Sequence, residues 1–228
     1  MSGNPGKSVA DYRLLARQYD HTTRRINRVR LDAIDALALR PGEVVLDVAC
    51  GTGFSFAPIL ERIGPRGFLL AFEHSPDLLE VARSRIAAGG WSNVLLVEAS
   101  AEAADFRAEI EQRRIARPAA ALFSYVHDVM QSEAALDNLL GQLAPEARVA
   151  ITGTRLWPRT WWPLCVPVNA YLYATHAQFI TNRGENVHRP WAKLERHLVD
   201  FEVRARWPGW RYVARGQLRP GAPDGRDC

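Results

Sequence analysis

The most informative segment of the chain runs Val44-Val45-Leu46-Asp47-Val48-Ala49-Cys50-Gly51-Thr52-Gly53-Phe54. Its first half is apolar and β-prone, as a strand covered on both faces requires. Gly51 and Gly53 then let the backbone turn tightly and approach a ligand without a Cβ clash. A helix that begins after such a turn presents unpaired N–H groups and a positive dipole end. The segment therefore predicts a strand, a glycine turn and a helix that bind a nucleotide-like or carboxylate-bearing cofactor.

Two common glycine motifs do not fit this turn. A dinucleotide fingerprint needs a third glycine at position 56, where the chain has Phe56. A phosphate-cradling loop needs a lysine, and none lies near the turn. The octet 46–53 instead resembles motif I of the class I S-adenosylmethionine (SAM) methyltransferases of the small-molecule type, whose Asp-x-x-x-Gly-x-Gly wraps the methionine half of SAM. The resemblance implies SAM as cofactor, with contacts from Asp47, Ala49, Gly51, Thr52 and Gly53.

The rest of the chain alternates between predicted helices and strands. Helical residues are expected within 8–39, 54–63, 76–88, 101–115 and 132–143. Strands are expected at 44–48, 68–72, 94–97, 119–126 and 147–153. Strands and helices that alternate at this spacing imply right-handed crossovers and a parallel sheet. Residues 155–198 show no clear period, and two further strands, 201–206 and 211–214, flank a Pro-Gly turn.

The resembled family closes its sheet with an antiparallel strand. The expected fold is therefore α/β: a Rossmann-like, seven-stranded, mostly parallel sheet with helices on both faces and an antiparallel last strand. We expect a single domain with five segments. These are N-terminal helices that close the cofactor pocket (1–40), a SAM-binding core (41–154), an aromatic-rich substrate insertion (155–199), a closing strand pair (200–218) and a tail (219–228).

Composition narrows the function classes. The net charge is +4 and the pI about 9.2, but the arginines are spread along the chain and interleaved with acids, so no nucleic-acid partner is expected. Three separated cysteines argue against a disulfide framework or a zinc site and fit a reducing cytoplasm. No signal peptide and no run of apolar residues long enough to span a membrane are visible. A cytoplasmic protein is expected, and the oligomeric state stays open.

Ligands of open α/β sheets bind at the carboxyl ends of the strands, so the strand ends hold the candidate cofactor contacts. Glu73 follows strand 68–72, where the resembled family carries an acid that accepts both ribose hydroxyls, and His74 lies beside it. After strand 94–97, Ser100 and Ala101 match the positions that read the adenine edge in quinone-type C-methyltransferases. The chain departs from that pattern, because Ser100 replaces an Asp or Asn. Ser100 as a helix cap and Glu98 as the adenine contact stay open as alternatives.

Two further cofactor contacts are expected. Ser124 belongs to the strand edge that passes the activated methyl group in the resembled family. Tyr19, followed by Asp20, resembles a Tyr-Asp pair that helps close the pocket in quinone and lipid-amine methyltransferases. The Tyr19-Asp20 pair is explained equally well as a plain helix N-terminus that is capped by Asp20 or Thr22.

The chemistry needs an acceptor aligned with the methyl donor, and a base only where the acceptor loses a proton. His127 is the candidate base because its ordinary pKa suits proton transfer near neutrality, and Asp128 could orient it or hold an amine substrate. A loop histidine that caps the next helix is the alternative. The sequence contains no cluster of potential metal ligands, so no metal ion is expected.

The aromatic-rich insertion is interpreted as an acceptor pocket, with substrate contacts from Tyr125, Trp157, Trp161 and Tyr171. A small satellite core and a membrane-surface contact flanked by Arg155 and Arg159 stay open. The expected function is methyl transfer to a small molecule: an aromatic, quinone-like, lipid-amine or natural-product intermediate. The alternatives are an RNA or protein methyltransferase, or a SAM-binding protein of this fold with other chemistry.

Overall fold

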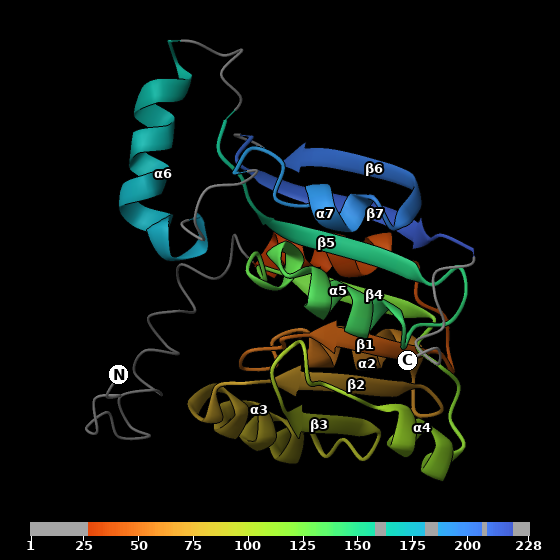
Figure 1. Ribbon diagram of the computed structural model, residues 1–228. Helices are drawn as coiled ribbons and strands as arrows, with labels where there is room; N and C mark the ends of the chain where they lie inside the picture. Colours follow the sequence, from red (N-terminus) through yellow and green to blue (C-terminus); the bar gives the residue numbers. More distant parts are fainter. Residues whose placement is uncertain (1–26, 158–162, 181–186, 207–208, 221–228) are drawn as a thin grey trace.

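The computed structural model describes residues 27–157, 163–180, 187–206 and 209–220. Within these ranges a seven-stranded sheet forms the centre of the molecule, in the order β3-β2-β1-β4-β5-β7-β6 (Figure 1). The strands are β1 (Val44–Val48), β2 (Phe68–Glu73), β3 (Val94–Glu98), β4 (Ala120–Ser124), β5 (Arg148–Thr154), β6 (Leu198–Arg206) and β7 (Arg211–Leu218). Neighbours from β3 to β5 pair in parallel, whereas β7 pairs antiparallel with β5 and β6. The expected fold class is confirmed.

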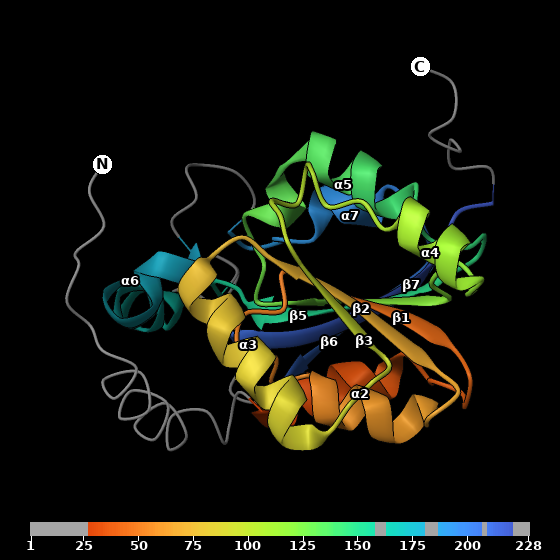
Figure 2. The same cartoon turned by 90° about the horizontal axis from the view of Figure 1, so that it is seen from below.

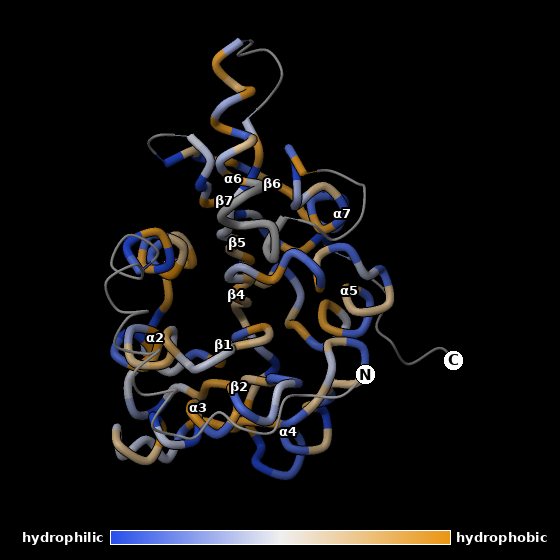
Figure 3. The backbone as a smooth tube through the Cα atoms, turned by 90° about the vertical axis from the view of Figure 1, so that its left-hand side faces the viewer, coloured by the Kyte–Doolittle hydropathy of each residue, from blue (hydrophilic) through white to orange (hydrophobic). Residues whose placement is uncertain are grey.

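Helices cover both faces of this sheet, as Figures 2 and 3 show. The helices in the described residues are 27–36, α2 (Phe56–Ile63), α3 (Pro76–Gly89), α4 (Arg107–Arg113), the 3-10 turn η1 (Val129–Gln131), α5 (Glu133–Leu140), α6 (Cys165–Ile180) and α7 (Ala192–Glu195), of which α6 stands beside the sheet. The helix 27–36, α2 and α3 pack on one face, and α4, α5 and α7 pack on the other.

The core explains why each strand faces two layers. Successive residues of a strand point to opposite faces, so Val45 of β1 joins Phe56 of α2 in one hydrophobic cluster. Leu46 joins Leu139 of α5 in the other cluster. Every residue of β1 is buried, Asp47 included, which accounts for the apolar residues at the other four positions of the strand.

One predicted helix is shorter than expected. Residues 101–106 are not helical, and α4 contains only Arg107–Arg113. The side chain of Gln142 fixes this segment, because its Oε1 accepts from the N–H of Phe106 and its Nε2 donates to the carbonyl of Ala104, both at 2.8 Å. Ala104 and Phe106 are buried, so tertiary packing overrides the local helical preference of this alanine-rich stretch.

A second difference is α6, which falls inside the stretch for which the sequence showed no period. Its residues are apolar or uncharged all around the helix, so no alternation of polar and apolar faces marks it in the sequence. No helix in the described ranges is long and apolar enough to cross a membrane.

The part of the first predicted helix that precedes residue 27 lies outside the described residues. The functional roles assigned to the five segments stay predictions.

Candidate active site

The glycine turn after β1 has left-handed backbone angles, as a tight turn requires. Three residues have positive φ angles, namely Ala49 (45°), Gly51 (58°) and Gly53 (76°). A Cβ at Gly53 would lie 2.6 Å from Cε2 of Phe56, which opens α2, so this position has no space for a side chain. The N–H of Cys50 donates to the carbonyl of Phe72 (2.9 Å), so the turn is tied to the end of β2.

Glu73, at the end of β2, strengthens this tie with its carboxylate. Oε2 accepts from the N–H of Gly51, and Oε1 accepts from the N–H groups of His74 and Ser75, all at 2.9 Å. The His74 side chain is 70% exposed, with Nδ1 3.1 Å from Oε1. The Glu73 carboxylate is therefore fixed in place where the sequence predicts the ribose contact.

Asp47 lies in β1 directly before the turn and is 1% exposed. Burial raises the pKa of this carboxyl to about 7, against the opposing effects of the Arg30 guanidinium and a hydrogen bond with Ser55. Its Oδ2 finds no hydrogen-bond partner among the described residues. Asp47 thus supplies a buried, titratable acceptor behind the glycine turn.

A cavity of about 610 Å³ opens at the carboxyl ends of the parallel strands. Most of the residues that the sequence singled out line it: Ala49, Gly51, Thr52, Glu73, His74, Ser100, Ala101, Ser124, Tyr125 and Asp128. They come from the ends of β1, β2, β3 and β4, so the sheet topology alone brings these distant segments together.

Other lining residues were missed by sequence reasoning: Arg30, Cys50, Phe54, Phe72, Leu78, Val81, Arg85, Glu102, Val126 and Val129. Cys50 and Phe54 lie within or next to motif I and could have been included from their position. The apolar residues of α3 carry no signal, because a cavity-facing side chain has the same periodicity as a core-facing one. Burial raises the pKa of the Cys50 thiol, so this side chain is held neutral.

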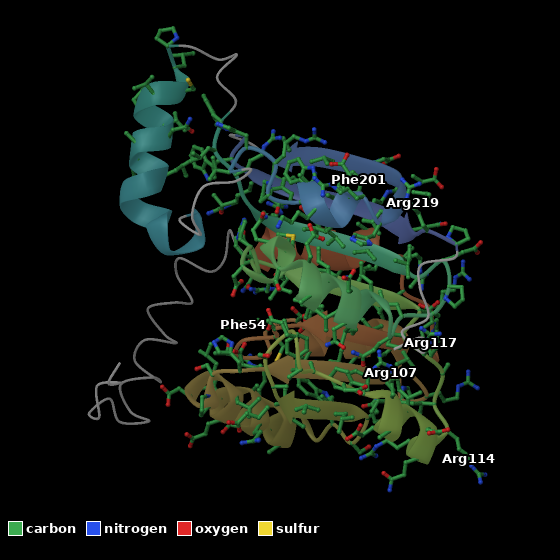
Figure 4. The ribbon with its side chains drawn as sticks, in the orientation of Figure 1. Phe54, Arg107, Arg114, Arg117, Phe201 and Arg219 are labelled. Carbon is green, nitrogen blue, oxygen red and sulfur yellow. The ribbon has the colours of Figure 1, made fainter. Side chains whose placement is uncertain are left out.

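Two arginines contact the same aromatic ring, Phe54, at the cavity. The guanidinium carbon of Arg85 is 4.3 Å from the Phe54 ring centroid and that of Arg30 is 5.6 Å away. Nε of Arg85 donates to the carbonyl of Thr52 (3.0 Å), and Nε of Arg30 donates to Oγ of Ser124 (3.2 Å). Figure 4 shows Phe54 at the edge where β1 and β2 end. Arg30 and Arg85 therefore place positive charge along one part of the cavity wall.

The segment after β4 forms another part of the cavity wall. Tyr125 has a φ of 62°, a conformation that residues with a side chain rarely adopt, and its N–H donates to the carbonyl of Thr152 (2.9 Å). Tyr125, Val126 and Asp128 line the cavity. The strained residue thus turns the chain so that this segment borders the cavity.

His127 lies behind that wall and is not among the residues that line the cavity. Its Nε2 lies 2.8 Å from the carbonyl of Thr154. A carbonyl only accepts, so Nε2 carries the proton and Nδ1 has a lone pair, for which no partner is found among the described residues. Burial lowers the pKa of the ring, which keeps it neutral. A base at this position would have to accept its proton at Nδ1.

Of the aromatic residues assigned to the acceptor, Tyr125 lines the cavity, whereas Trp157 and Tyr171 lie away from it. Tyr171 is 57% exposed on α6. Trp157 pairs through its backbone with Asn169, at 2.8 and 3.1 Å, and so anchors α6 to the end of β5. Neither residue lines the cavity. Tyr19 and Trp161 lie outside the described residues, so their assigned contacts stay predictions.

The residues present fit SAM on three observations. The backbone at Gly51 is open to close approach, because no atom lies within 4 Å of the position that a Cβ would take there, and the cavity size lies within the range for small-molecule sites. The carboxylate of Glu73 lines the cavity and provides negative charge near a positively charged cofactor, whereas Asp47 and Gly53 are not among the lining residues. In the part of the chain that the structure describes, no group of His, Cys, Asp and Glu side chains could hold a metal ion.

Comparison with known proteins agrees with this geometry. A model of a methyltransferase domain family matches residues 45–146. A protein-L-isoaspartate O-methyltransferase of Ignicoccus hospitalis is 39% identical over 64 residues, which cover 28% of this chain and 30% of that protein. A demethylmenaquinone methyltransferase of Shouchella clausii is 32% identical over 74 residues, 32% of each chain. The chain thus spans about a third of the length of these curated relatives.

The fold is also that of solved methyltransferase structures. An O-methyltransferase family protein from Burkholderia thailandensis superposes with a TM-score of 0.62 at 19% identity, over 89% of this chain and 59% of that chain. Likeness at this identity shows the fold alone. The matched segment, residues 45–146, is a methyltransferase domain, and together with motif I it makes the chain similar to the class I SAM-dependent methyltransferases, whose cofactor is S-adenosyl-L-methionine.

Proposed function

We propose that this protein transfers a methyl group from SAM to a small-molecule acceptor. The carrying observation is that one cavity of about 610 Å³ is lined both by the expected cofactor residues and by the segment after β4. A cofactor held by Thr52, Glu73 and Ser100 would therefore lie in the same cavity as an acceptor held near Tyr125 and Asp128.

The cofactor side of the cavity is proposed to act by binding and orientation. SAM supplies an activated methyl group on a sulfonium. The Glu73 carboxylate would hold the ribose, Ser100 and Ala101 would contact the adenine edge, and the turn at Gly51 and Thr52 would receive the methionine half. Glu73 is already fixed by three backbone N–H groups, so little conformational entropy is lost when a ligand binds to it.

The acceptor side is proposed to position an amphipathic molecule. Apolar side chains such as Val126 and Val129 line this part of the cavity, next to the carboxylate of Asp128. Such a lining excludes water and orients the acceptor. Orientation of this kind can supply roughly 7–11 kcal/mol of barrier reduction in favourable cases. Where the acceptor loses a proton, the proposed base is His127 acting through Nδ1, and the buried ring would have to become accessible on binding.

A nucleic-acid acceptor fits less well with the distribution of charge. Arg107, Arg114 and Arg117 lie at the edge of the molecule opposite to Phe54, as Figure 4 shows. The cavity itself is bordered by Glu73, Glu102 and Asp128 as well as by two arginines. A phosphate backbone guided to the site would need a continuous basic surface there.

The acceptor class is tested by incubating the purified protein, methyl-labelled SAM and an extract of the native host. The products are separated into organic-soluble molecules, RNA and protein. Label in the organic phase supports the proposal, whereas label in RNA or protein would refute the small-molecule acceptor. The variant Glu73→Ala serves as the matched control, because loss of its cofactor contact should abolish label in every fraction.

A further inference from the structure

The loop after β3 brings to the cavity a carboxylate that has no role in the proposed function. Three consecutive residues of this loop line the cavity, namely Ser100, Ala101 and Glu102. Under the proposed function Ser100 and Ala101 contact the adenine edge, but neither side chain carries a charge. Glu102 is the ionisable residue of the three, so it can supply a charge that its two neighbours cannot.

Hydrogen bonds hold the Glu102 carboxylate in a defined position. Its Oε1 accepts from Oγ of Ser132, the residue before α5, at 2.9 Å. Hydrogen bonds from the backbone N–H of Glu102 itself and from the hydroxyls of Ser132 and Ser100 lower the pKa of this carboxyl. Glu102 is therefore ionised near neutral pH, and an ionised carboxylate only accepts hydrogen bonds.

The backbone that carries Glu102 is fixed by a second side chain from α5. Nδ2 of Asn138 donates to the carbonyl of Ala101 at 3.0 Å and to that of Ala104 at 2.9 Å. These two bonds lie on either side of position 102, and both alanines are buried. A carboxylate that is held by its neighbours on a fixed loop loses little conformational entropy when a ligand binds to it.

The hydrogen-bond donors of the cofactor narrow the choice of partner for this carboxylate. SAM donates from its ribose hydroxyls, from the ammonium of its methionine half and from the amino group on its adenine ring. Under the proposed function Glu73 holds the ribose, and the turn at Gly51 and Thr52 receives the methionine half. Glu102 belongs to neither position, because it follows β3, next to the two residues assigned to adenine. The amino group of adenine is therefore the donor that remains for Glu102.

Glu98, the other carboxylate near Ser100, does not line the cavity. Its side chain is 52% exposed, and its Oε2 lies 3.9 Å from Nη2 of Arg83 on α3. The alternative that Glu98 reads the adenine is therefore not supported by its position. Glu98 and Glu102 form a natural pair for comparison, because both are exposed carboxylates on the same segment and only Glu102 borders the cavity.

We propose that Glu102 makes the site specific for adenine, because its carboxylate accepts a hydrogen bond from the exocyclic amino group of the bound cofactor. This assignment rests on the proposed function, in which Ser100 and Ala101 contact the adenine edge. A purine with hydrogen in place of the amino group would leave the ionised carboxylate without this donor. A site built around such a hydrogen bond rejects the analogue that lacks it.

The test compares two ligands that differ in this amino group alone. They are S-adenosylhomocysteine, which SAM becomes after methyl transfer, and its analogue with hydrogen in place of the amino group. Calorimetry with the unmodified full-length protein should show about tenfold weaker binding of the analogue. Glu102→Ala should bind both ligands within about twofold of each other. Glu102→Gln should show an intermediate preference, because its amide oxygen is a neutral and weaker acceptor.

Two further variants separate adenine recognition from general effects on the site. Glu98→Ala removes the carboxylate outside the cavity and should keep the full preference for S-adenosylhomocysteine. Glu73→Ala should weaken the binding of both ligands by the same factor, because the ribose is common to both. The circular dichroism spectrum of Glu102→Ala should match that of the unmodified protein, since the side chain is exposed.

The outcomes distinguish this assignment from the proposed function. If Glu102→Ala and Glu102→Gln bind S-adenosylhomocysteine with an unchanged preference over the analogue, the assignment is overturned and the proposed function stands. A preference that disappears in Glu98→Ala but persists in Glu102→Ala overturns the assignment in favour of Glu98. Failure of the unmodified protein to bind S-adenosylhomocysteine at all overturns the assignment and the proposed function together.

Discussion

Oε2 of Glu73 accepts a hydrogen bond of 2.9 Å from the backbone N–H of Gly51, and this contact joins the end of β2 to the glycine turn after β1. One carboxylate thus supports the turn and stands at the edge of the cavity. Structural and ligand-binding roles meet in the same side chain, so its substitution should affect both stability and cofactor affinity.

Glu73→Ala is expected to weaken SAM binding by about 2–4 kcal/mol, since the ribose would lose charge-assisted hydrogen bonds and the turn its support. The SAM affinity of Glu73→Gln should lie between those of the unmodified protein and Glu73→Ala, because the amide oxygen can still accept a hydrogen bond from the N–H of Gly51. Titration calorimetry with SAM measures the effect, and Glu80→Ala, which removes an exposed carboxylate on α3, is the control. Unchanged affinity in Glu73→Ala would exclude the ribose contact.

The two glycines of the turn should respond unequally to alanine. Gly51 has a φ of 58° but open space where a Cβ would lie, so Gly51→Ala should cost about 1–2 kcal/mol of backbone strain. Gly53→Ala adds a contact of 2.6 Å with the Phe56 ring, which should cost roughly 1–3 kcal/mol more. Urea unfolding of both variants measures this difference. Equal destabilisation would mean that Phe56 moves aside freely.

Because the pKa of Asp47 is raised in the folded protein, we expect the free energy of unfolding to fall as the pH rises. The carboxyl has a pKa of about 7 in the folded protein and an ordinary pKa of 3.8 when unfolded, so between these limits the folded state binds more protons. The stabilisation is complete below the lower value and is lost as the pH rises through the upper one. Between pH 5 and pH 8 this group should therefore reduce the free energy of unfolding by about 2–3 kcal/mol.

Asp47→Asn should remove this decline, since an amide does not titrate in the range. Denaturant unfolding at pH 5 and pH 8 compares the two proteins. The informative quantity is the difference between the two pH values, because the amide also changes hydrogen bonding at both. The same decline in both proteins would assign the pH dependence to another group.

His127→Gln separates a catalytic from a positioning role. The glutamine amide can still donate to the carbonyl of Thr154, but it cannot take up a proton. If His127 is the base, kcat should fall by about 10²–10⁴-fold, and the decline in activity at acid pH should vanish, with SAM affinity unchanged. A lower melting temperature with an unaltered pH profile would show instead that the ring only links the segment after β4 to β5.

Much of this architecture could be predicted because its signals are local. The mostly apolar segment 44–48, the glycines after it and the acid at the end of β2 specify a strand, a turn and a strand end within a few residues each. The alternation of strands and helices then fixes a parallel sheet, since right-handed crossovers leave few other arrangements. For the same reason most expected cofactor residues lie along one cavity.

Other features depend on contacts between distant segments. The helix expected at 101–106 gives way to hydrogen bonds from Gln142, which is more than thirty residues away in the sequence. Arg30 enters the cavity wall because the helix 27–36 packs beside the end of β4, where Ser124 accepts from it. No local pattern encodes such a partnership.

His127 shows both kinds of signal, the local sequence and the long-range packing, at a single residue. Its position after a strand end is a property of the sequence, and this position makes it a candidate base. Whether the ring faces the cavity or the carbonyl of Thr154 depends on how the segment after β4 packs against β5. Short-range backbone preferences and hydrophobic periodicity therefore specify the elements and their order, whereas side-chain orientation, burial and pKa follow from long-range packing, which exists only once the chain has folded.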